Sequence, residues 1–383
     1  MIGSFDFLLP TKIRYGAGIV HVLGEELKLL HAEKVMVITD KGLVGTGMVQ
    51  KITDLIQAEG IPFLLYDEIE GNPKDYNVEA CANKAREESV DTLLAFGGGS
   101  PIDAAKAVAV LAKQGGTVRS YEGKGKIKDD CLPLLTIPTT AGTGSEVTFS
   151  SVITDTTQKF KFTIKSTAIA ARTAIIDPEL TVSVPPHITA ATGIDALTHA
   201  IEGYTAICTE PIAEAVGLYA VAYIAGSIVE AVQNGSNLEA RDNMMMGSLL
   251  AGLSFSHADV ASVHCMAEAL GSIYDAPHGM CNAILLPYVM EYNLPAAEHK
   301  YAKIARAMGI EEADDYKAAK KGIEHIRNLS KEIGLPGIKS LNVHPDDFEV
   351  LAELSVKNGS NSSNPRELTK DGYWELFRKA YEG

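Results

Sequence analysis

Short apolar runs alternate with stretches of helical spacing through the first half of the chain, between residue 34 and about residue 177. The runs are rich in Val, Ile, Leu and Phe and occupy residues 35–39, 63–66, 92–96 and 132–137. Between them, apolar residues recur with a helical period over residues 48–60 and 76–88. Buried strands separated by helices are typical of βαβ units, in which helices cover both faces of a parallel sheet. The first half is therefore predicted to be an α/β domain with a doubly wound, mostly parallel and Rossmann-like sheet.

The second half of the chain shows a different pattern. Strand-like runs disappear after residue 178, and long stretches rich in Ala, Leu and Met follow with helical spacing at residues 190–204, 211–234, 238–254 and 316–333. Pro185 and Pro186 separate the two patterns, because proline continues neither a sheet ladder nor a helix interior. A chain of 383 residues also exceeds the size at which one hydrophobic core usually stops growing. We therefore expect two domains, an α/β domain over residues 1–180 and an all-helical domain over residues 181–383.

Charge and cysteine content narrow the class of protein. The formal net charge of −15 disfavours binding to nucleic acid and to anionic membrane surfaces, since both need basic patches. Five scattered cysteines without a C-x-x-C pair favour reduced thiols over a disulfide framework. No apolar run approaches the ~20 residues that span a bilayer, and the first residues lack a basic segment followed by an apolar one. We expect a cytoplasmic protein whose partners are small molecules and copies of itself.

Three consecutive glycines follow the strand-like run that ends at Phe96 and lead directly into an alanine-rich helix. Ser100 suits the N-cap of this helix, Pro101 its first position, and Asp103 the return bond of a capping box. Glycine lets the backbone approach a ligand closely, and a helix start offers free N–H groups and partial positive charge. A pyrophosphate is the expected occupant. The alternative is a plain strand-to-helix turn, since the triplet lacks the G-x-G-x-x-G spacing.

Two further features favour a dinucleotide at this sheet. Asp40 comes just after the first strand-like run, where a carboxylate can accept hydrogen bonds from an adenosine ribose and repel a 2′-phosphate. Its alternative role is to cap the next helix. A dense cluster of hydroxyls and glycines, residues 137–146, follows the run that ends at residue 137. Open α/β sheets bind ligands at the carboxyl ends of their strands, so this cluster is a second candidate contact.

Four residues of the helical half have the chemistry of a metal site. Asp195 and His199 are four residues apart and therefore project from one face of a predicted helix, where they can chelate one divalent ion. His264 and His278 lie farther along the chain in apolar surroundings. For any one of these histidines alone, a hydrogen-bonded role in the core is the more common explanation. Spacing does not establish that the four side chains meet.

Together these segments resemble the iron-containing alcohol dehydrogenase family almost from end to end. The motifs that carry the resemblance are G-G-G-S-P-x-D at residues 97–103, P-T-T-A-G-T-G-S-E at 138–146, G-x-D-A-L-T-H-A-I-E at 193–202 and P-H-G at 277–279. Similarity also covers residues 7–18, 263–287 and 364–383. The resemblance implies a nucleotide-binding α/β domain followed by a helical metal-binding and catalytic domain, an architecture shared with dehydroquinate synthases.

The resemblance also implies site residues and partners. Asp195, His199, His264 and His278 would ligate Fe²⁺, or Zn²⁺ as in some relatives. An acidic residue at position 40 goes with NAD rather than NADP. A homodimer or higher homo-oligomer is expected. The contacts to NAD carried over by motif match are Asp40, Asn72, Gly98, Gly99, Ser100, Thr139, Thr140, Thr143 and Lys161.

One position departs from the family pattern. Many relatives carry a second histidine four residues after the one that matches His264, and this chain has Glu268 there. A carboxylate one turn from a metal ligand can carry protons, become a further ligand, hydrogen-bond to substrate or serve only as a structural replacement. The change therefore bears on the polarity of the pocket and on substrate choice.

The hypothesis is a metal-dependent, NAD-linked dehydrogenase that passes hydride between a short-chain primary alcohol or diol, or an aldehyde, and the cofactor. Substrates of the lactaldehyde or 1,3-propanediol type suit the same ligands. One alternative is a non-redox lyase of the dehydroquinate synthase type, and another is a non-catalytic metal- or nucleotide-binding protein. Net formation of NADH from a simple alcohol would separate the dehydrogenase from the lyase. A non-catalytic protein predicts four closed ligands with no open position for substrate.

Overall fold

The computed structural model describes residues 3–128 and 130–383, which divide into two compact units. The α/β unit comprises residues 8–140 and 145–182. The helical unit comprises residues 183–383 together with the segment before Leu8 and the short segment 141–144. The chain of the α/β unit is therefore interrupted once by four residues that belong to the helical unit.

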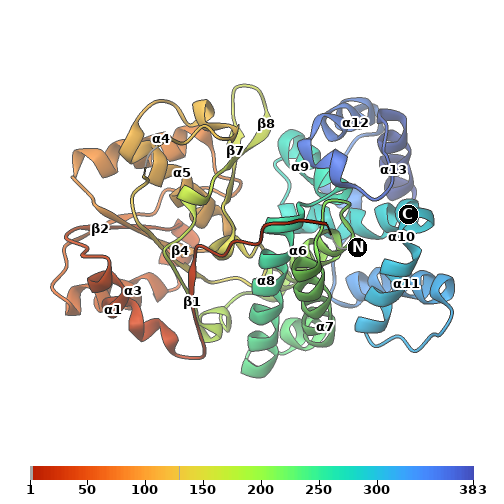
Figure 1. Ribbon diagram of the computed structural model, residues 1–383, viewed down its shortest axis with the longest axis horizontal. Coiled ribbons are helices and arrows are strands. Elements are labelled where there is room, and N and C mark those ends of the chain that lie inside the picture. Colours follow the sequence, from red (N-terminus) through yellow and green to blue (C-terminus); the bar gives the residue numbers. More distant parts are fainter. Residues whose placement is uncertain (1–2, 129) are drawn as a thin grey trace. The chain divides into compact units, whose positions relative to one another are not determined.

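A six-stranded parallel sheet forms the centre of the α/β unit (Figure 1). Its order is β1–β9–β6–β4–β2–β3, and every neighbouring pair runs parallel. The strands span Lys12–Tyr15 (β1), Val35–Ile38 (β2), Phe63–Tyr66 (β3), Thr92–Gly97 (β4), Leu134–Pro138 (β6) and Thr173–Ile176 (β9). The prediction of a doubly wound, mostly parallel sheet is confirmed.

Helices cover both faces of this sheet because successive side chains of its strands point in opposite directions. Val35 and Val37 of β2 belong to a core cluster with residues of α1 (Leu23–Leu29) and α3 (Met48–Ala58). Met36 and Ile38 of the same strand belong to the cluster formed with α4 (Asp75–Glu87) and α5 (Gly99–Gln114). Short α2 (Lys41–Val44) follows β2 directly. The four central strands are therefore buried on both sides, which explains their nearly continuous apolar sequence.

A second, three-stranded sheet of order β5–β8–β7 was not foreseen from the apolar pattern. It contains β5 (Gly123–Lys124), β7 (Ser150–Asp155) and β8 (Phe160–Lys165), and β7 and β8 form an antiparallel hairpin. These strands carry many Thr, Ser and Lys residues, so no apolar run marks them. Single turns of 3₁₀ helix connect the larger elements at Ile19–Val22 (η1), Val118–Tyr121 (η2), Ser145–Val147 (η3), Thr167–Ile169 (η4) and Pro178–Thr181 (η5).

The helical unit contains no strand among its described residues, as expected from the sequence. Its helices are α6 (Pro186–Thr205), α7 (Pro211–Gln233), α8 (Leu238–Ala258), α9 (Ser262–Tyr274), α10 (His278–Ala307), α11 (Asp315–Glu332), α12 (Phe348–Lys357) and α13 (Lys370–Glu382). Shorter 3₁₀ turns lie at Ile338–Leu341 (η6), Pro345–Asp347 (η7) and Gly359–Ser363 (η8).

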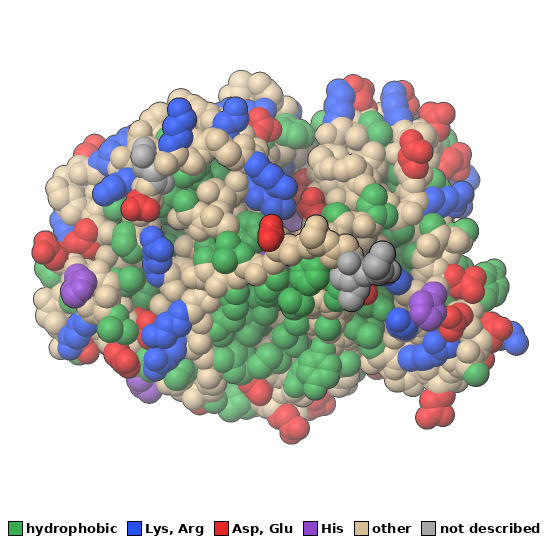
Figure 2. Space-filling model, viewed as in Figure 1, with side chains coloured by type: hydrophobic (Ala, Val, Ile, Leu, Met, Phe, Trp, Pro, Cys, Tyr) green, Lys and Arg blue, Asp and Glu red, His purple; other side chains and the backbone are tan. Residues whose placement is uncertain are grey.

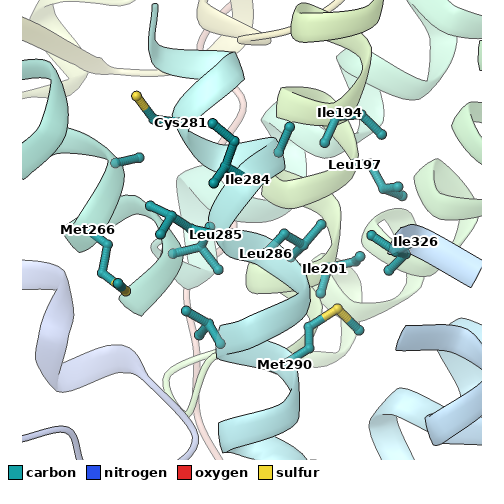
Figure 3. Packing of buried hydrophobic residues seen from close by; sticks show 14 of the residues in the cluster. Ile194, Leu197, Ile201, Met266, Cys281, Ile284, Leu285, Leu286, Met290 and Ile326 are labelled. Carbon is teal, nitrogen blue, oxygen red and sulfur yellow. The ribbon is translucent and has the colours of Figure 1, made fainter. Parts of the chain in front are cut away.

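One large hydrophobic core holds these helices together. Leu197 and Ile201 of α6 belong to the same core cluster as Leu286 and Met290 of α10 (Figure 3). Met266 of α9 belongs to the same cluster. Dense packing of this kind leaves little freedom to slide one helix past another. The core therefore fixes the relative positions of α6, α9 and α10, the three helices that carry the candidate metal ligands.

Helix α7 differs from the expectation that no apolar segment approaches the length that spans a membrane. Its 23 residues are long and apolar enough to cross a membrane by length and composition alone. However, α7 packs against both α6 and α8, and it buries Ala213, Val221, Ile224 and Ile228 in the core. Its apolar composition is therefore explained in part by burial within the bundle.

Candidate metal centre

The face of α6 that points away from the apolar core carries polar residues at intervals of one helical turn. Asp195 and His199 lie on this face, with His199 Nδ1 3.9 Å from Asp195 Oδ2. Both side chains are almost completely buried. Gly193 lets α6 approach its neighbours closely here, since a Cβ at this position would lie 2.8 Å from side-chain atoms of Ile228 and Met244. Close packing of α6 against α7 and α8 thus holds its polar face in place.

The four residues expected to bind a metal come together in the structure. Asp195, His199, His264 and His278 each offer one ligand atom, and these atoms all lie within 4.8 Å of one another. His264 Nε2 is 3.0 Å from His199 Nε2, and His278 Nε2 is 3.8 Å from Asp195 Oδ1. Helices α6, α9 and α10 supply the four residues. Their convergence could not be read from spacing, because it depends on how three helices pack.

The arrangement fits a divalent cation. Ligands at about 2.0–2.1 Å from a tetrahedral ion lie about 3.4 Å from one another, which is close to the separations seen here. One carboxylate with three imidazoles suits iron or zinc better than magnesium or calcium, which prefer oxygen ligands. Asp195, His199 and His264 are buried, whereas the His278 side chain is 26% exposed. The centre is therefore reachable from solvent on one side, as a catalytic rather than a closed structural site requires.

The protonation states of His199 and Asp195 favour metal binding. Burial lowers the pKa of His199 to about 4, so its imidazole is neutral at physiological pH. Burial by itself raises the pKa of Asp195, but the neighbouring His199, His278 and His264 reverse this effect and hold it below its ordinary value. A neutral imidazole and an ionised carboxylate are the forms that donate electron pairs to a cation.

Two buried residues beside the ligands were not identified from the sequence as site residues. The Glu202 carboxylate lies 2.5 Å from His264 Nδ1. Asn282 Nδ2 donates to Asp195 Oδ1 at 2.7 Å and is also 3.1 Å from His264 Nε2. A helical-wheel count could have found both, because Glu202 follows Asp195 by seven residues and Asn282 follows His278 by four.

Glu268 lies one turn after His264 on α9 and is partly exposed. Its Oε2 accepts a hydrogen bond from Asn358 Nδ2 at 2.6 Å, and its charge acts on His264. Among the described residues, the group that could share a metal ion consists of the Asp and three His residues named above and does not include Glu268. The structure thus gives this carboxylate a hydrogen-bond partner one helical turn from the candidate ligand His264.

The glycine loop of the α/β unit corrects the expected start of its helix. Helix α5 begins at Gly99 with Gly98 as N-cap, two residues before the predicted N-cap Ser100, and no side chain caps it. Asp103 closes no capping box, because its carboxylate instead accepts hydrogen bonds from Ser145 Oγ and Val152 N. Gly97 has a φ of +153°, and a Cβ there would lie 2.7 Å from Pro101 Cγ. This tight turn starts the helix early, with its first N–H groups uncovered by side chains.

The other candidate NAD contacts of the α/β unit are distributed around strand ends. Asp40 Oδ1 caps α2 by accepting from Leu43 N at 2.9 Å, so the capping role considered for it is real. Its Oδ2 lies 3.6 Å from the Cβ position of Gly97, beside the glycine loop. A Cβ on Gly98 would lie 3.3 Å from Thr140 Oγ1, and Thr139 N donates to the Gly97 carbonyl at 3.0 Å.

Two more candidate NAD contacts of the α/β unit contact each other, and the last candidate belongs to the helical unit. Lys161 Nζ on β8 donates to Asn72 Oδ1 at 2.8 Å. Asn72 has a φ of +50°, in the left-handed region that asparagine tolerates better than most residues. Thr143 lies in the segment 141–144 of the helical unit.

Comparisons with known proteins agree with the geometry. A family model described as iron-containing alcohol dehydrogenase matches residues 10–178, and one described as the C-terminal part of the Fe-containing alcohol dehydrogenase family matches residues 189–381. The chain is 41% identical to 1,3-propanediol dehydrogenase of Citrobacter freundii, over 98% of this chain and 99% of that protein. A crystal structure of 1,3-propanediol oxidoreductase superposes with a TM-score of 0.96 at 40% identity, covering 99% of this chain and 100% of that one. Sulfoacetaldehyde reductase from Bifidobacterium kashiwanohense in complex with NAD⁺ gives a TM-score of 0.89 at 31% identity, covering 99% of each chain.

Proposed function

This chain belongs to the iron-containing alcohol dehydrogenase family of NAD-linked alcohol and aldehyde oxidoreductases, and we propose that its substrates are short-chain primary alcohols or diols and the corresponding aldehydes. The observation that carries this proposal is the convergence of Asp195, His199, His264 and His278 within 4.8 Å. A 1,3-diol is the first candidate, because a relative that matches the whole chain at 41% identity is named for 1,3-propanediol.

We assign Asp195, His199, His264 and His278 as the residues that hold Fe²⁺, with Zn²⁺ as the other candidate. A divalent cation held there would act as a Lewis acid toward the alcohol or carbonyl oxygen, and NAD would accept or return the hydride. The protein's part is to keep His199 neutral and Asp195 ionised in a largely buried site. The partly exposed His278 marks the side from which substrate would enter.

We assign NAD binding to the α/β unit, with the pyrophosphate at the glycine loop. Gly98, Gly99 and Ser100 lie at the start of α5, where N–H groups and the helix dipole favour an anion. Thr139 and Thr140 follow β6, next to this loop. Asp40 would accept hydrogen bonds from the adenosine ribose and repel a 2′-phosphate, which favours NAD over NADP. Asn72, Lys161 and Thr143 complete the proposed set.

Glu268 is proposed to contact the part of the substrate that does not react. Its bond to Asn358 restrains the carboxylate one turn from His264. A restrained acceptor favours substrates that carry a second hydrogen-bond donor, such as the far hydroxyl of a diol. This role would explain why the chain has a carboxylate where many relatives have histidine.

A homodimer or higher homo-oligomer in the cytoplasm is also proposed. Hydrophobic side chains gather over α7 and α8 on the face shown in Figure 2. On α7, Ile212 is 41% exposed and Tyr219 61% exposed, along the side of the helix that does not enter the core. Exposed apolar faces of this kind are typical of protein contacts. Light scattering on the wild type and on Tyr219→Lys tests this, and a wild-type mass equal to one chain would refute it.

The experiment for the function is an NADH-absorbance screen against matched alcohols and aldehydes with Fe²⁺, Zn²⁺ or no added metal. We expect NADH to form from a short diol or primary alcohol, and turnover to stop when a chelator removes the metal while NAD still binds. Undiminished turnover after metal removal would reject the assigned role of the four ligands. Absence of net NADH with every alcohol would instead favour a non-redox or non-catalytic protein.

A further inference from the structure

Glu202 of α6 is a carboxylate buried beside the metal ligands, with 3% of its surface exposed. It accepts hydrogen bonds from three groups near the start of α9. Its Oε1 accepts from Val263 N at 2.7 Å, and its Oε2 accepts from Ala261 N at 2.9 Å. The third donor is the His264 ring, whose Nδ1 lies 2.5 Å from Oε2. One side chain thus connects α6, which carries two candidate ligands, to the helix that carries a third.

The contact with His264 determines which ring nitrogen can bind a cation. An ionised carboxylate only accepts hydrogen bonds, so Nδ1 of His264 must carry the proton. In the neutral ring Nε2 then carries the lone pair, and Nε2 is the atom that lies 3.0 Å from His199 Nε2 within the ligand group. A carboxylate behind a ligating histidine fixes both the tautomer and the ring orientation, and it makes the ligand more basic.

Glu202 also balances charge. A divalent cation in this buried site brings two positive charges, and Asp195 supplies one negative charge. The neutral imidazoles supply none. A buried charge is costly unless it is compensated nearby. The Glu202 carboxylate, one imidazole ring away from the ligand atom, supplies the second negative charge.

We propose that Glu202 is a positioning residue of the metal centre, which sets the affinity for the divalent cation by orienting His264 and completing the charge balance. This inference rests on the proposed metal site. It assigns a role to a residue that neither holds the cation directly nor contacts the substrate.

A purely structural role must be distinguished, because Glu202 also holds the start of α9. Glu210 provides a matched control in the same unit. It is buried at 8% exposure and caps α7 by accepting from Ile212 N at 2.8 Å and Ala213 N at 2.7 Å. Glu202 and Glu210 therefore both satisfy two backbone N–H groups at a helix start. Only Glu202 has a candidate metal ligand as its third donor.

The test compares Glu202→Gln, Glu202→Asp and Glu210→Gln with the wild type. Affinity for Zn²⁺ and Co²⁺ is measured by competition with a chromophoric chelator, and Co²⁺ absorption reports ligand geometry. Melting temperatures of the metal-free proteins report any loss of stability that does not depend on the metal. We expect Glu202→Gln to bind metal about 10–100-fold more weakly, as typical when an outer partner of a ligand is lost, with an altered Co²⁺ spectrum. Glu202→Asp keeps the charge and should recover part of the affinity, whereas Glu210→Gln should melt lower but bind metal like the wild type.

The inference is overturned if Glu202→Gln folds and binds metal within roughly threefold of the wild type, well below the usual effect of such a loss. If Glu202→Gln does not fold, Glu202→Asp provides the test. A structural role alone would be indicated if Glu202→Asp binds metal with wild-type affinity, keeps the wild-type Co²⁺ spectrum and is destabilised as much as Glu210→Gln. A wild type that binds neither ion would refute the proposed metal site itself. The two failures are therefore distinguishable.

Discussion

Replacement of Lys106 by methionine should destabilise the α/β unit. Lys106 is completely buried in α5, yet it carries an ammonium group. Its Nζ donates to Ser145 Oγ at 2.9 Å, to Thr148 Oγ1 at 2.8 Å and to the Ser150 carbonyl at 2.8 Å. These bonds join α5, which starts at the glycine loop, to residues 145–150, which contain the end of the hydroxyl and glycine cluster and the residues after it. Methionine fills a similar volume but donates no hydrogen bond.

The expected loss of unfolding free energy in Lys106→Met is the difference between two opposing effects. Each hydrogen bond from a charged donor contributes about 1.5–3 kcal/mol, and Lys106 makes three. Against this, burial lowers the pKa of Lys106 from 10.5 to about 8, although Asp103 and Glu146 partly oppose the change. A lowering of this size corresponds to about 3 kcal/mol against the charged form. The net loss should be about 2–6 kcal/mol, which includes the roughly 3–5 kcal/mol typical when one partner of a buried charged pair is removed.

Local unfolding free energies measured by hydrogen exchange provide the assay. Amides of α5 and β7 should exchange faster in Lys106→Met, whereas fluorescence of the single tryptophan, Trp374 of α13, should report little change in the helical unit. Lys113→Met is the control, because Lys113 lies on the same helix but is exposed. NAD affinity should fall with the loss of order at the start of α5. Equal exchange in Lys106→Met and Lys113→Met would refute the reasoning.

Three further predictions concern single residues. Gly144→Ala should lower the free energy of unfolding by about 2–4 kcal/mol, because Gly144 has a φ of +57° and a Cβ there would lie 2.6 Å from Gly252 Cα. Thermal melting of the helical unit measures this loss, and an unchanged melting midpoint would contradict it. Burial raises the pKa of Glu146 from 4.5 to about 7, so the folded protein holds a proton between these pH values that the unfolded chain releases. Stability should therefore fall by about 3 kcal/mol as the pH rises from 4.5 to 7, and Glu146→Gln should remove this part of the slope in denaturant titrations at several pH values. Glu268→His should lower kcat/KM for a diol more than for the matched simple alcohol without changing metal affinity, and equal losses for both alcohols would argue against contact with the substrate.

The elements marked by an apolar run or by apolar residues at helical spacing were predictable from sequence. Strand β3 begins and ends at the expected residues, α7 ends one residue before its predicted end, and α11 begins and ends one residue earlier than predicted. The hairpin β7–β8 was not predicted because Thr, Ser and Lys interrupt the apolar residues of its strands. The start of α5 was misplaced for a local reason. Ser100 and Pro101 form good capping patterns, but the tight turn at Gly97 begins the helix earlier, and the Asp103 carboxylate accepts hydrogen bonds from Ser145 and Val152 instead.

The sequence placed only two of the four candidate metal ligands next to each other. The spacing of Asp195 and His199 placed both on one helix face, because four residues complete about one turn. The sequence did not show that His264 and His278 join them, and it gave no role to Glu202. That carboxylate is distinguished by its contacts with α9, which exist only once the two helices pack.

By itself, the sequence determined the α/β and helical halves, the glycine loop and the kinds of side chain available to bind a metal and a dinucleotide. These properties follow from local periodicity and residue chemistry, which need no partner segment. Tertiary structure decided which histidines share one centre, which nitrogen of His264 faces it and which carboxylates stand behind the ligands. Such properties depend on distances between helices far apart in the chain, and those distances are set by the packing of apolar side chains on the opposite faces of the same helices.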